Sequence, residues 1–344
     1  MEMKDILPPV SILVLNYNGL SYLEKFMRSI LNTDYPNFQV VLVDNGSTDG
    51  SLEFIRKNYP DVKIIAFNNN YGFAGAYNRS IEMVNSDILL LINNDIEVDK
   101  NWLKELVKYI SDDGVATIAP KIKFLDKRDI INSVGGNCDI YGVAWNRGNG
   151  EKDLGQYDKP DEVFYVNGAV LILKKSVWKD VGPFDSRYFM YAEEVDWCWR
   201  ARLKGYKIIY IPNSVVFHKW QGSSKNTPFI YLMERNWLCN MLKNYETKTL
   251  ITTIPVYILL KTLKSIWLAF KGKNNEKLVI PKAILWNLKN LKGTLQRRKY
   301  VQATRKIPDK QLKKTMQNMS YEISLLLGRS KHPILQRYKG KSNP

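Results

Sequence analysis

The chain has 344 residues, of which 45% are hydrophobic and 12% aromatic, enough for one large domain with an appendage or for two domains. Its three cysteines, Cys138, Cys198 and Cys239, are widely spaced and odd in number, which argues against a disulfide framework or a zinc motif and favours a reducing compartment. The N-terminal stretch MEMKDILPPV lacks the apolar core of a signal peptide, so we expect a cytoplasmic protein.

The net charge of +17 comes from the C-terminal part of the chain. Residues 245–344 carry 22 Lys and Arg against 4 Asp and Glu, a net +18, whereas the residues before them carry 29 basic and 30 acidic side chains, a net −1. Such an asymmetry predicts two parts with different partners. We therefore expect a domain over residues 1–245 and a basic helical region over residues 246–344.

Apolar runs alternate with helical patterns along the first part. The runs VSILVLN, FQVVLVD, VKIIAF and DILLLIN are continuous, as in strands that are covered on both faces, and a helical pattern or turn follows each of them. Residues 121–160 are rich in Gly and Asp and are predicted to form an irregular functional loop. The pattern predicts an α/β fold with a mainly parallel sheet flanked by helices. Later strands are predicted over 115–120, 165–175, 207–212 and 214–218, and later helices over 101–111, 176–182, 192–205 and 228–244.

Polar residues follow each of the first four predicted strands. One such end is an ordinary turn, but the carboxyl ends of parallel strands share one edge of a sheet, where open α/β folds bind their ligands. The chain has neither GxGxxG after its first strand nor GxxxxGK[ST], which excludes the dinucleotide fingerprint and the P-loop. Acids at this edge suit a divalent cation with a phosphate-bearing ligand. The strand ends are Asn16-Tyr17-Asn18, Asp44-Asn45-Gly46-Ser47, Asn68-Asn69-Asn70 and Asn93-Asn94-Asp95.

A second cluster of acids, Glu193, Glu194 and Asp196, opens the predicted helix over 192–205. Acids favour helix N-termini, and Asp196 with Arg200 forms an i,i+4 ion pair, so a purely structural explanation exists. Three acids in four positions nevertheless exceed what a helix cap needs. Like charges held together raise one pKa toward the working range of a catalytic base.

Five motifs in this order resemble glycosyltransferase family 2, which has the GT-A fold, and within it the rhamnosyltransferase-like branch. They are VDNGSTDGS, NNNYGFAGAYN, NND, YAEEVDWCWR and FHKWQGSS, and the resemblance covers about residues 8–245. It implies an inverting enzyme that moves a sugar, rhamnose in this branch, from a nucleotide-diphospho-sugar to a hydroxyl of a glycan or lipid-linked acceptor in cell-surface polysaccharide synthesis. The alternatives are a catalytically inactive GT-A scaffold at the membrane and a sugar nucleotidyltransferase.

The same resemblance implies roles for individual residues. Asp95 would bind Mn²⁺ or Mg²⁺ together with His218, and the family's DxD motif reads Asn93-Asn94-Asp95 here. Glu194 lies where the family has its catalytic base, usually an aspartate, and Glu193 is its rival; the base would deprotonate the acceptor in a single, inverting displacement. Close helix–sheet packing is the alternative explanation for the glycines of the third helix. The residues implied to contact the nucleotide-sugar are Tyr17, Asp44, Asn45, Gly72, Gly75, Asn78, Asn94 and Trp220.

The basic C-terminal region places apolar and basic residues at helical spacing. Lys261 and Lys264 interrupt the apolar stretch 251–273, so we do not expect it to span a bilayer. With Trp267 and Trp286 at the interface, the region suits an anionic membrane surface, which predicts a peripheral protein on the inner face of the cell membrane. The alternative is a helical cap packed on the catalytic domain. Nucleic acid is a poor partner because no recognised motif accompanies the charge, and the sequence predicts no oligomeric state.

Overall fold

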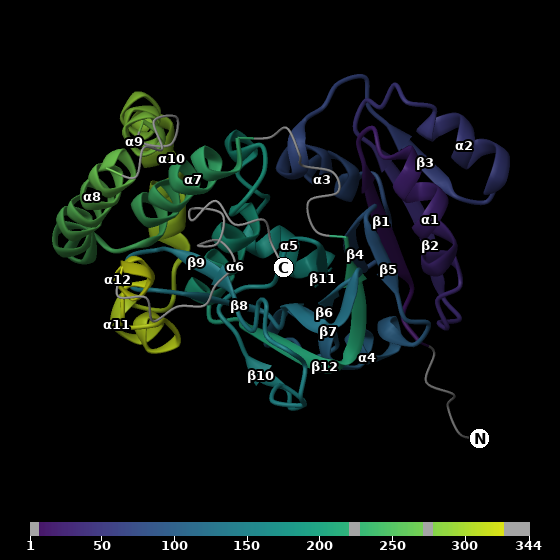
Figure 1. Ribbon diagram of the computed structural model, residues 1–344. Helices are drawn as coiled ribbons and strands as arrows, with labels where there is room; N and C mark the ends of the chain where they lie inside the picture. Colours follow the sequence, from purple (N-terminus) through teal and green to yellow (C-terminus); the bar gives the residue numbers. More distant parts are fainter. Residues whose placement is uncertain (1–6, 220–227, 271–277, 327–344) are drawn as a thin grey trace.

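A ten-stranded mixed sheet lies at the centre of the computed structural model, which describes residues 7–219, 228–270 and 278–326 (Figure 1). Its strands are β1 (Val10–Asn16), β2 (Phe38–Asp44), β3 (Lys63–Ala66), β4 (Ile88–Asn93), β5 (Ile96–Val98), β6 (Val115–Phe124), β7 (Lys127–Ser133), β10 (Asp161–Glu162), β11 (Val170–Lys174) and β12 (Lys207–His218). A separate pair consists of β8 (Gly136–Cys138) and β9 (Ala144–Asn146). The accompanying helices are α1 (Leu20–Leu31), α2 (Ser51–Asn58), α3 (Gly72–Glu82), α4 (Trp102–Ile110), α5 (Lys175–Val181), the short 3₁₀ helix η1 (Ser186–Tyr188), α6 (Glu193–Leu203) and α7 (Phe229–Asn244).

The order of the strands confirms the predicted fold class. Neighbours in the sheet run β10-β12-β6-β11-β4-β1-β2-β3, with β5 on β12 and β7 on β6. Four neighbouring strands, β4, β1, β2 and β3, are parallel to one another, and β12 is parallel to β6. β11 is antiparallel to its neighbours β4 and β6. The carboxyl ends of β1, β2 and β4 therefore meet at one edge, and β11 enters the sheet beside them.

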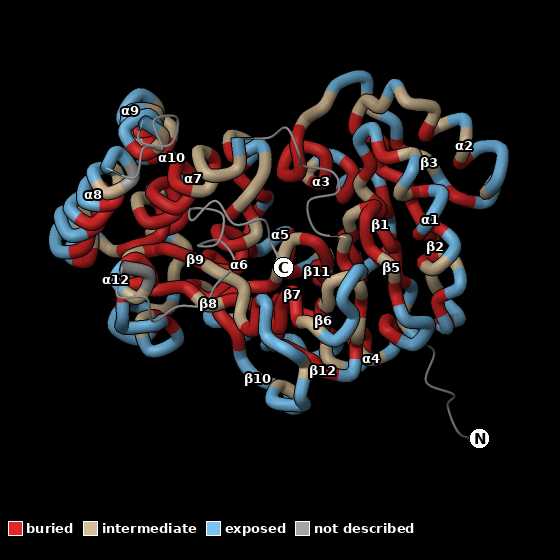
Figure 2. The backbone as a smooth tube through the Cα atoms, viewed as in Figure 1, coloured by how far each residue is buried: buried red, intermediate tan, exposed pale blue. Residues whose placement is uncertain are grey.

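The continuous apolar runs form strands because helices cover both faces of the sheet. Along β4, Leu89 and Leu91 join a hydrophobic cluster that includes Tyr77 of α3, whereas Leu90 and Ile92 join a second cluster with side chains of α1 and α4. Successive residues of a strand point to opposite faces, so each residue of β4 from Ile88 to Ile92 is buried in one cluster or the other. Figure 2 shows this buried centre and the exposed outer sides of the helices.

Residues 121–160 contain more regular structure than the sequence predicts, so the expected irregular loop is wrong to that extent. β6 continues through Lys121 to Phe124, and β7, β8 and β9 follow. Lys121 is buried within its strand because its ammonium lies 3.2 Å from a carboxylate oxygen of Asp153 and also contacts Asp158. In the sequence these charged residues look typical of a solvent-exposed loop. In the structure Lys121 instead forms ion pairs with Asp153 and Asp158 of the same segment.

Among the C-terminal helices, α9 (Val279–Lys289) and α10 (Leu291–Thr304) pack directly on α7. The others are α8 (Thr247–Phe270), α11 (Asp309–Leu312), the 3₁₀ helix η2 (Lys313–Thr315) and α12 (Tyr321–Leu326). Met316 and Tyr321 join the hydrophobic cluster that contains Trp199 of α6, and Arg298 donates to the carbonyl of Leu242 at 2.8 Å. These helices therefore form a cap on the first part of the chain, while a domain boundary at residue 245 stays a prediction. The outer faces of α8 and α9 are exposed (Figure 2).

Candidate active site

Polar side chains from three strand ends are joined at one edge of the sheet. The amide of Asn16, which ends β1, donates to Asp44 Oδ1 at the end of β2 at 3.0 Å. The amide of Asn94, directly after β4, donates to Asn16 Oδ1 at 2.6 Å. Asn16 is the register partner of Asp44, so the contact follows from parallel strands that end together. The predicted convergence of these ends is confirmed.

Asp44 and Asn45 form hydrogen bonds with the backbone of the turns at this edge. Asp44 is fully buried, and its second carboxylate oxygen accepts a backbone N–H of the following turn at 2.9 Å. Asn45 accepts the N–H of Tyr71 at 3.0 Å and donates to the carbonyl of Gly72 at 3.2 Å, which holds the turn that begins α3. Tyr17, by contrast, is 42% exposed. Contact of Tyr17, Asp44 and Asn45 with a nucleotide base stays a prediction.

The start of α3 packs tightly against the turn that precedes α6. Gly72 has a φ of +68°, and a Cβ at this position would lie 2.2 Å from the carbonyl oxygen of Phe189. A Cβ on Gly75 would lie 2.9 Å from the side chain of the residue before the helix. Asn78 donates to the carbonyl of Phe184 at 2.9 Å and accepts its N–H at 3.0 Å. Gly72 and Asn78 therefore pack α3 against the segment before α6, not against the sheet as the alternative explanation supposed. Contact of all three residues with a nucleotide stays a prediction.

Asp95 and His218 form a buried pair beyond the ends of β4 and β12. His218 Nε2 lies 3.4 Å from Asp95 Oδ1, and this oxygen accepts no hydrogen bond from the residues that the structure describes. His218 Nδ1 lies 3.2 Å from the amide oxygen of Asn132, which fixes the orientation of the ring. A buried carboxylate oxygen with unused acceptor capacity next to an imidazole suits a divalent cation such as Mn²⁺.

The described residues do not form a complete metal site by themselves. Within 7–219, 228–270 and 278–326, no group of three or more His, Cys, Asp or Glu side chains converges. Glu97, the second acid of the triplet that begins at Asp95, forms an ion pair with Arg128 at 2.7 Å. A cation at Asp95 would therefore take its other ligands from water or from diphosphate oxygens, as Mg²⁺ commonly does. Trp220, predicted to lie at the diphosphate, falls outside the described residues.

Glu193 and Glu194 open α6 in different surroundings. Glu193 is 3% exposed, and among the described residues its Oε2 has no hydrogen-bond partner; burial and the neighbouring Glu194 raise the pKa of Glu193 well above its usual range. Glu194 is partly exposed, and burial raises the pKa of its carboxyl to about 7. Burial thus outweighs the helix dipole, which favours the ionised form. At neutral pH Glu193 is a neutral acid, whereas Glu194 exchanges a proton readily.

Glu194 borders the same sheet edge as Asp95. A Cβ on Gly168 would lie 3.5 Å from Glu194 Cδ, so this carboxyl packs against the residues that lead into β11. The next residue, Ala169, accepts the N–H of Asn93 at 3.0 Å, two positions before Asp95. The segments that carry the two predicted acids therefore meet at the carboxyl end of β4.

The turn that presents the two glutamates is strained and is held by α7. Phe189, Tyr191 and Ala192 have φ angles of 65°, 70° and 61°, in a region that residues other than glycine rarely adopt. Asn236 donates to the carbonyl of Tyr191 at 2.6 Å, and Asn240 donates to the carbonyl of Ala192 at 3.2 Å. Neither asparagine can be recognised as part of this turn from the sequence, because polar residues on a predicted helix carry no signal of a partner about 45 residues away along the chain.

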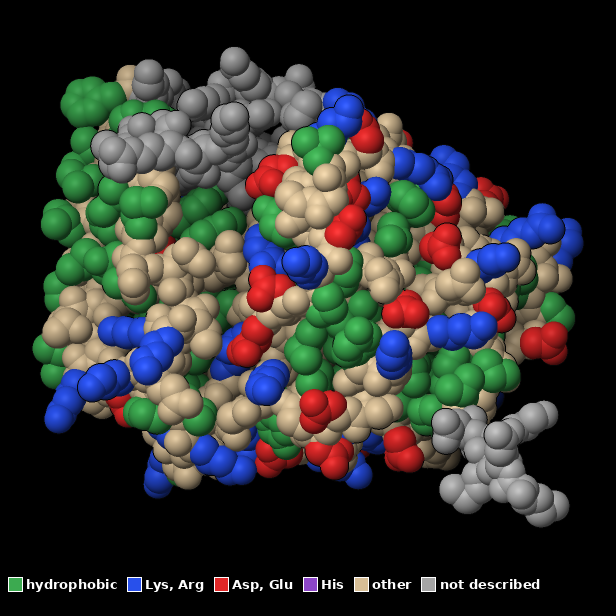
Figure 3. Space-filling model, turned by 90° about the horizontal axis from the view of Figure 1, so that it is seen from below, with side chains coloured by type: hydrophobic (Ala, Val, Ile, Leu, Met, Phe, Trp, Pro, Cys, Tyr) green, Lys and Arg blue, Asp and Glu red, His purple; other side chains and the backbone are tan. Residues whose placement is uncertain are grey.

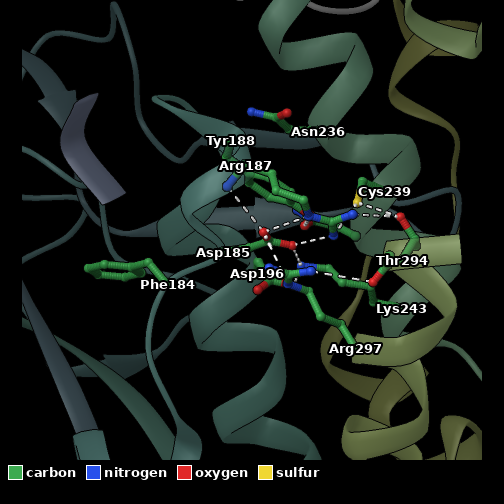
Figure 4. A network of polar contacts seen from close by, with 12 residues as sticks. Phe184, Asp185, Arg187, Tyr188, Asp196, Asn236, Cys239, Lys243, Thr294 and Arg297 are labelled. Carbon is green, nitrogen blue, oxygen red and sulfur yellow. Dashed lines mark hydrogen bonds and ion pairs between the residues drawn. The ribbon is translucent and has the colours of Figure 1, made fainter. Parts of the chain in front are cut away.

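A buried network of charges lies beside this turn (Figure 4). Asp185 lies 2.6 Å from Arg187 and 3.0 Å from Lys243, and Lys243 lies 2.9 Å from Asp196. Burial opposes ionisation of both acids, but the cations hold the pKa of Asp185 and of Asp196 below the usual value. Arg297 of α10 also reaches Asp185, at 3.3 Å. The network therefore connects the region before α6 to α7 and to the C-terminal helices.

Known proteins resemble this chain in sequence and in fold. Residues 11–180 match the family model described as glycosyl transferase family 2. The chain is 28% identical over 255 residues to the N-acetylglucosaminyl-diphospho-decaprenol L-rhamnosyltransferase of Mycobacterium tuberculosis, and the match covers 67% of this chain and 81% of that protein. GalNAc-T7 with UDP, GalNAc and Mn²⁺ superimposes with a TM-score of 0.57 at 18% identity, over 71% of this chain and 49% of the other.

A second solved structure covers more of the chain. The mannosyltransferase PcManGT of Pyrobaculum calidifontis, in complex with GDP-Man and Mn²⁺, has a TM-score of 0.51 at 16% identity over 86% of both chains. At these identities the two structures show that the GT-A fold is shared. The family match, the curated relative and the arrangement of the strand ends agree with the motifs read from the sequence. The chain therefore resembles glycosyltransferase family 2, whose model matches residues 11–180, and within it the rhamnosyltransferase-like branch.

Proposed function

We propose that the protein is a metal-dependent, inverting glycosyltransferase that uses a nucleotide-diphospho-sugar donor, with Glu194 as its catalytic base. One observation carries the proposal: a partly exposed glutamate with a pKa of about 7 borders the sheet edge that also holds Asp95. A general base works best when its pKa lies near the operating pH. Glu193 is a weaker candidate because it is buried and stays protonated at neutral pH.

The chemistry that we propose is a single displacement at the anomeric carbon of the donor. Glu194 takes the proton of an acceptor hydroxyl while the hydroxyl oxygen forms a bond to that carbon. The bond from the carbon to the diphosphate breaks at the same time, and its electron pair leaves with the nucleoside diphosphate. Because attack and departure are on opposite faces, one such step inverts the configuration.

Asp95 and His218 would hold a divalent cation, Mn²⁺ or Mg²⁺. The acceptor capacity of Asp95 Oδ1 and the 3.4 Å separation from His218 Nε2 support this assignment. A bound cation would neutralise the negative charge that grows on the departing diphosphate. The folds of two proteins solved with Mn²⁺ give independent support. Asn132 would keep the imidazole of His218 in the orientation that metal binding needs.

The curated relative suggests the donor and the acceptor. Its name gives an L-rhamnosyl donor group and a diphospho-decaprenol acceptor. We therefore propose rhamnose as the sugar and a lipid-linked glycan as the acceptor of this chain, in the synthesis of a cell-surface polysaccharide. On the donor side, Tyr17, Asp44, Asn45 and Asn94 would surround the nucleotide, because they lie at or next to the carboxyl ends of β1, β2 and β4.

A sugar-nucleotide assay with glutamate variants tests the proposal. The full-length protein is incubated with Mn²⁺ and each of a panel of nucleotide-sugars that includes dTDP-rhamnose, and the released nucleotide is identified. We expect a nucleoside diphosphate, with hydrolysis or transfer lost in Glu194→Gln and kept in the matched variant Glu193→Gln. Release of pyrophosphate would indicate a nucleotidyltransferase. Binding of a donor without any turnover would indicate an inactive scaffold.

A further inference from the structure

The long helix α8 has two charged residues between Ile251 and Phe270, and both face inward. Lys261 lies 2.7 Å from Glu234 of α7, and Lys264 lies 3.0 Å from the same carboxylate. Glu322 of α12 contacts both lysines, with Lys264 at 3.0 Å. All four side chains are buried, so α8 is joined to α7 and α12 by a buried group that contains two cations and two anions.

These buried ion pairs determine how α8 can contact a membrane. The segment Thr247–Trp267 is long and apolar enough to cross a bilayer by length and composition, and 28% of it is buried against the rest of the chain. Crossing would separate Lys261 and Lys264 from Glu234 and Glu322, and breaking a buried ion pair leaves a costly uncompensated charge. The helix therefore stays against the folded chain, and its outer face is the part that a membrane can reach.

The outer face of α8 is uncharged and mostly apolar from Ile251 to Phe270. From Ile251 to Phe270 the helix is about 29 Å long at 1.5 Å per residue, and its exposed face carries no charged side chain. Scattered exposed apolar residues are ordinary on a protein surface, but a continuous stripe of this length marks an interaction site. In Figure 3 hydrophobic side chains gather along the left edge, the side on which Figure 1 shows α8. The stripe consists of Ile251 (68% exposed), Val256 (37%), Leu259 (58%), Leu263 (47%), Ile266 (48%) and Phe270 (87%).

The neighbouring helix α9 and its continuation α10 add positive charge beside the stripe. Exposed leucines alternate there with exposed lysines at spacings of three, four and seven residues, which place them on adjoining lines of the helix surface. Apolar residues next to a line of lysines are typical of helices that lie in the interface of an anionic bilayer. The residues are Leu278, Leu285, Leu288 and Leu295 with Lys282, Lys289, Lys292 and Lys299.

We propose that the outer face of α8, with the lysines of α9 and α10, docks on an anionic lipid bilayer, and that α8 lies in the plane of the interface without crossing it. A second copy of the chain fits this face less well. Paired helices gain specificity from complementary charges beside their apolar seam, whereas the seam of α8 has none and the lysines of α9 would repel their own copies. This proposal adds a lipid surface, and the face of the protein that contacts it, to the proposed function. It rests on the proposed function for the lipid-linked acceptor.

Flotation of the full-length protein with vesicles tests the docking surface. Phosphatidylcholine vesicles are compared with vesicles of equal parts phosphatidylcholine and phosphatidylglycerol. We expect flotation with the anionic vesicles, a loss of about tenfold in the bound fraction for Leu259→Glu with Leu263→Glu, and no loss for Leu154→Glu, a 77% exposed leucine elsewhere. Wild-type protein that stays unbound, or a double variant that floats like the wild type, would overturn the proposal.

Three further measurements test the contribution of the lysines, whether α8 crosses the bilayer, and whether the face binds a second copy of the chain. Lys282→Gln with Lys289→Gln should weaken binding to anionic vesicles more than the matched exposed pair Lys57→Gln with Lys63→Gln. Alkaline carbonate should release the protein from the vesicles, and resistance to it would overturn the in-plane arrangement. A dimer in the absence of lipid that Leu259→Glu with Leu263→Glu dissociates would assign this face to a second copy. Nucleotide-sugar hydrolysis should be unchanged in the docking variants. A failure of the docking proposal can therefore be distinguished from a failure of the proposed function.

Discussion

The amide of Asn236 donates to the carbonyl oxygen of Tyr191 at 2.6 Å, and so joins α7 to the strained turn that presents the two glutamates of the candidate site. The same amide donates to the carbonyl of Met190 at 3.2 Å. Residues in such sparsely populated backbone conformations persist when their surroundings hold them, and they occur most often at functional sites. We therefore predict that Asn236 positions Glu194, the proposed base.

Replacing Asn236 by Ala should lower kcat by about tenfold to a hundredfold, because small displacements of a catalytic group reduce rates strongly. The KM for the donor should change little, since the donor side of the site is built by other strands. Steady-state kinetics with a nucleotide-sugar measure both constants. The matched variant is Asn287→Ala, which also removes a buried amide that donates to backbone carbonyls, but in α9. Equal loss of kcat in both variants would contradict a positioning role for Asn236.

The rate should depend on pH through the ionisation of Glu194. Burial raises the pKa of this carboxyl to about 7, so the base is protonated and inactive below that pH. We expect kcat to rise with pH up to about 7 and to level off above it, tenfold per pH unit on the acid side. Glu193→Gln should keep the midpoint, because Glu193 is neutral over this range. A rate that is flat between about pH 5 and pH 9, roughly two units either side of the pKa, would exclude Glu194 as the base.

The stability of the fold should depend on pH through Glu193. The pKa of this buried carboxyl is raised in the folded state, so the unfolded chain loses its proton first as the pH rises. Between the unfolded value of about 4.3 and the folded pKa, the wild type should lose about 1.4 kcal/mol per pH unit relative to Glu193→Gln. Urea unfolding at several pH values measures the difference. The two proteins should be equally stable near pH 4, the approximate unfolded pKa, and a constant difference at all pH values would contradict this prediction.

Lys243 should be essential for stability. It is 1% exposed and lies between the buried carboxylates of Asp185 and Asp196, so Lys243→Met leaves two anions without their shared cation. Removing one partner of a buried ion pair costs about 3–5 kcal/mol. The exposed Lys248→Met on α8 should change the free energy of unfolding by less than about 0.5 kcal/mol. Chemical denaturation of both variants provides the comparison.

Metal binding should depend on Asn132 as well as on Asp95 and His218. The amide oxygen of Asn132 lies 3.2 Å from His218 Nδ1, and loss of such a contact typically weakens metal affinity by about 10–100-fold. A Mn²⁺ titration of the thermal shift in the presence of dTDP should therefore move to higher Mn²⁺ concentration in Asn132→Ala and lose its Mn²⁺ dependence in Asp95→Asn. An unchanged titration in both variants would place the cation elsewhere.

Local patterns were sufficient to predict the sheet and the strand ends. The apolar runs that became β1, β2 and β4 are strands because they need burial on both faces, and Asn16, Asp44 and Asn94 meet because parallel strands end together. The acids at the start of α6 were also visible as a cluster. These predictions depend on residues that are close in sequence or related by the geometry of a parallel sheet.

Distant pairings could not be predicted in the same way. Lys261 and Lys264 interrupt an apolar stretch and look like exposed charges, but Glu234 and Glu322 neutralise them from α7 and α12. The partner of Lys121 is likewise Asp153, across a stretch that the sequence suggested was irregular. A buried charge can be recognised from sequence only when its counter-ion is known, and that depends on tertiary packing.

The contact between Gly72 and Phe189 has a consequence for the order of events at the site. A Cβ at position 72 would lie 2.2 Å from the carbonyl oxygen of Phe189, so the beginning of α3 and the turn before Glu194 are in direct contact. A donor that settles against α3 would therefore also set the location of the proton-accepting carboxyl before the second substrate arrives. The close contact at Gly72 would then require the sugar nucleotide to bind before the acceptor hydroxyl is activated.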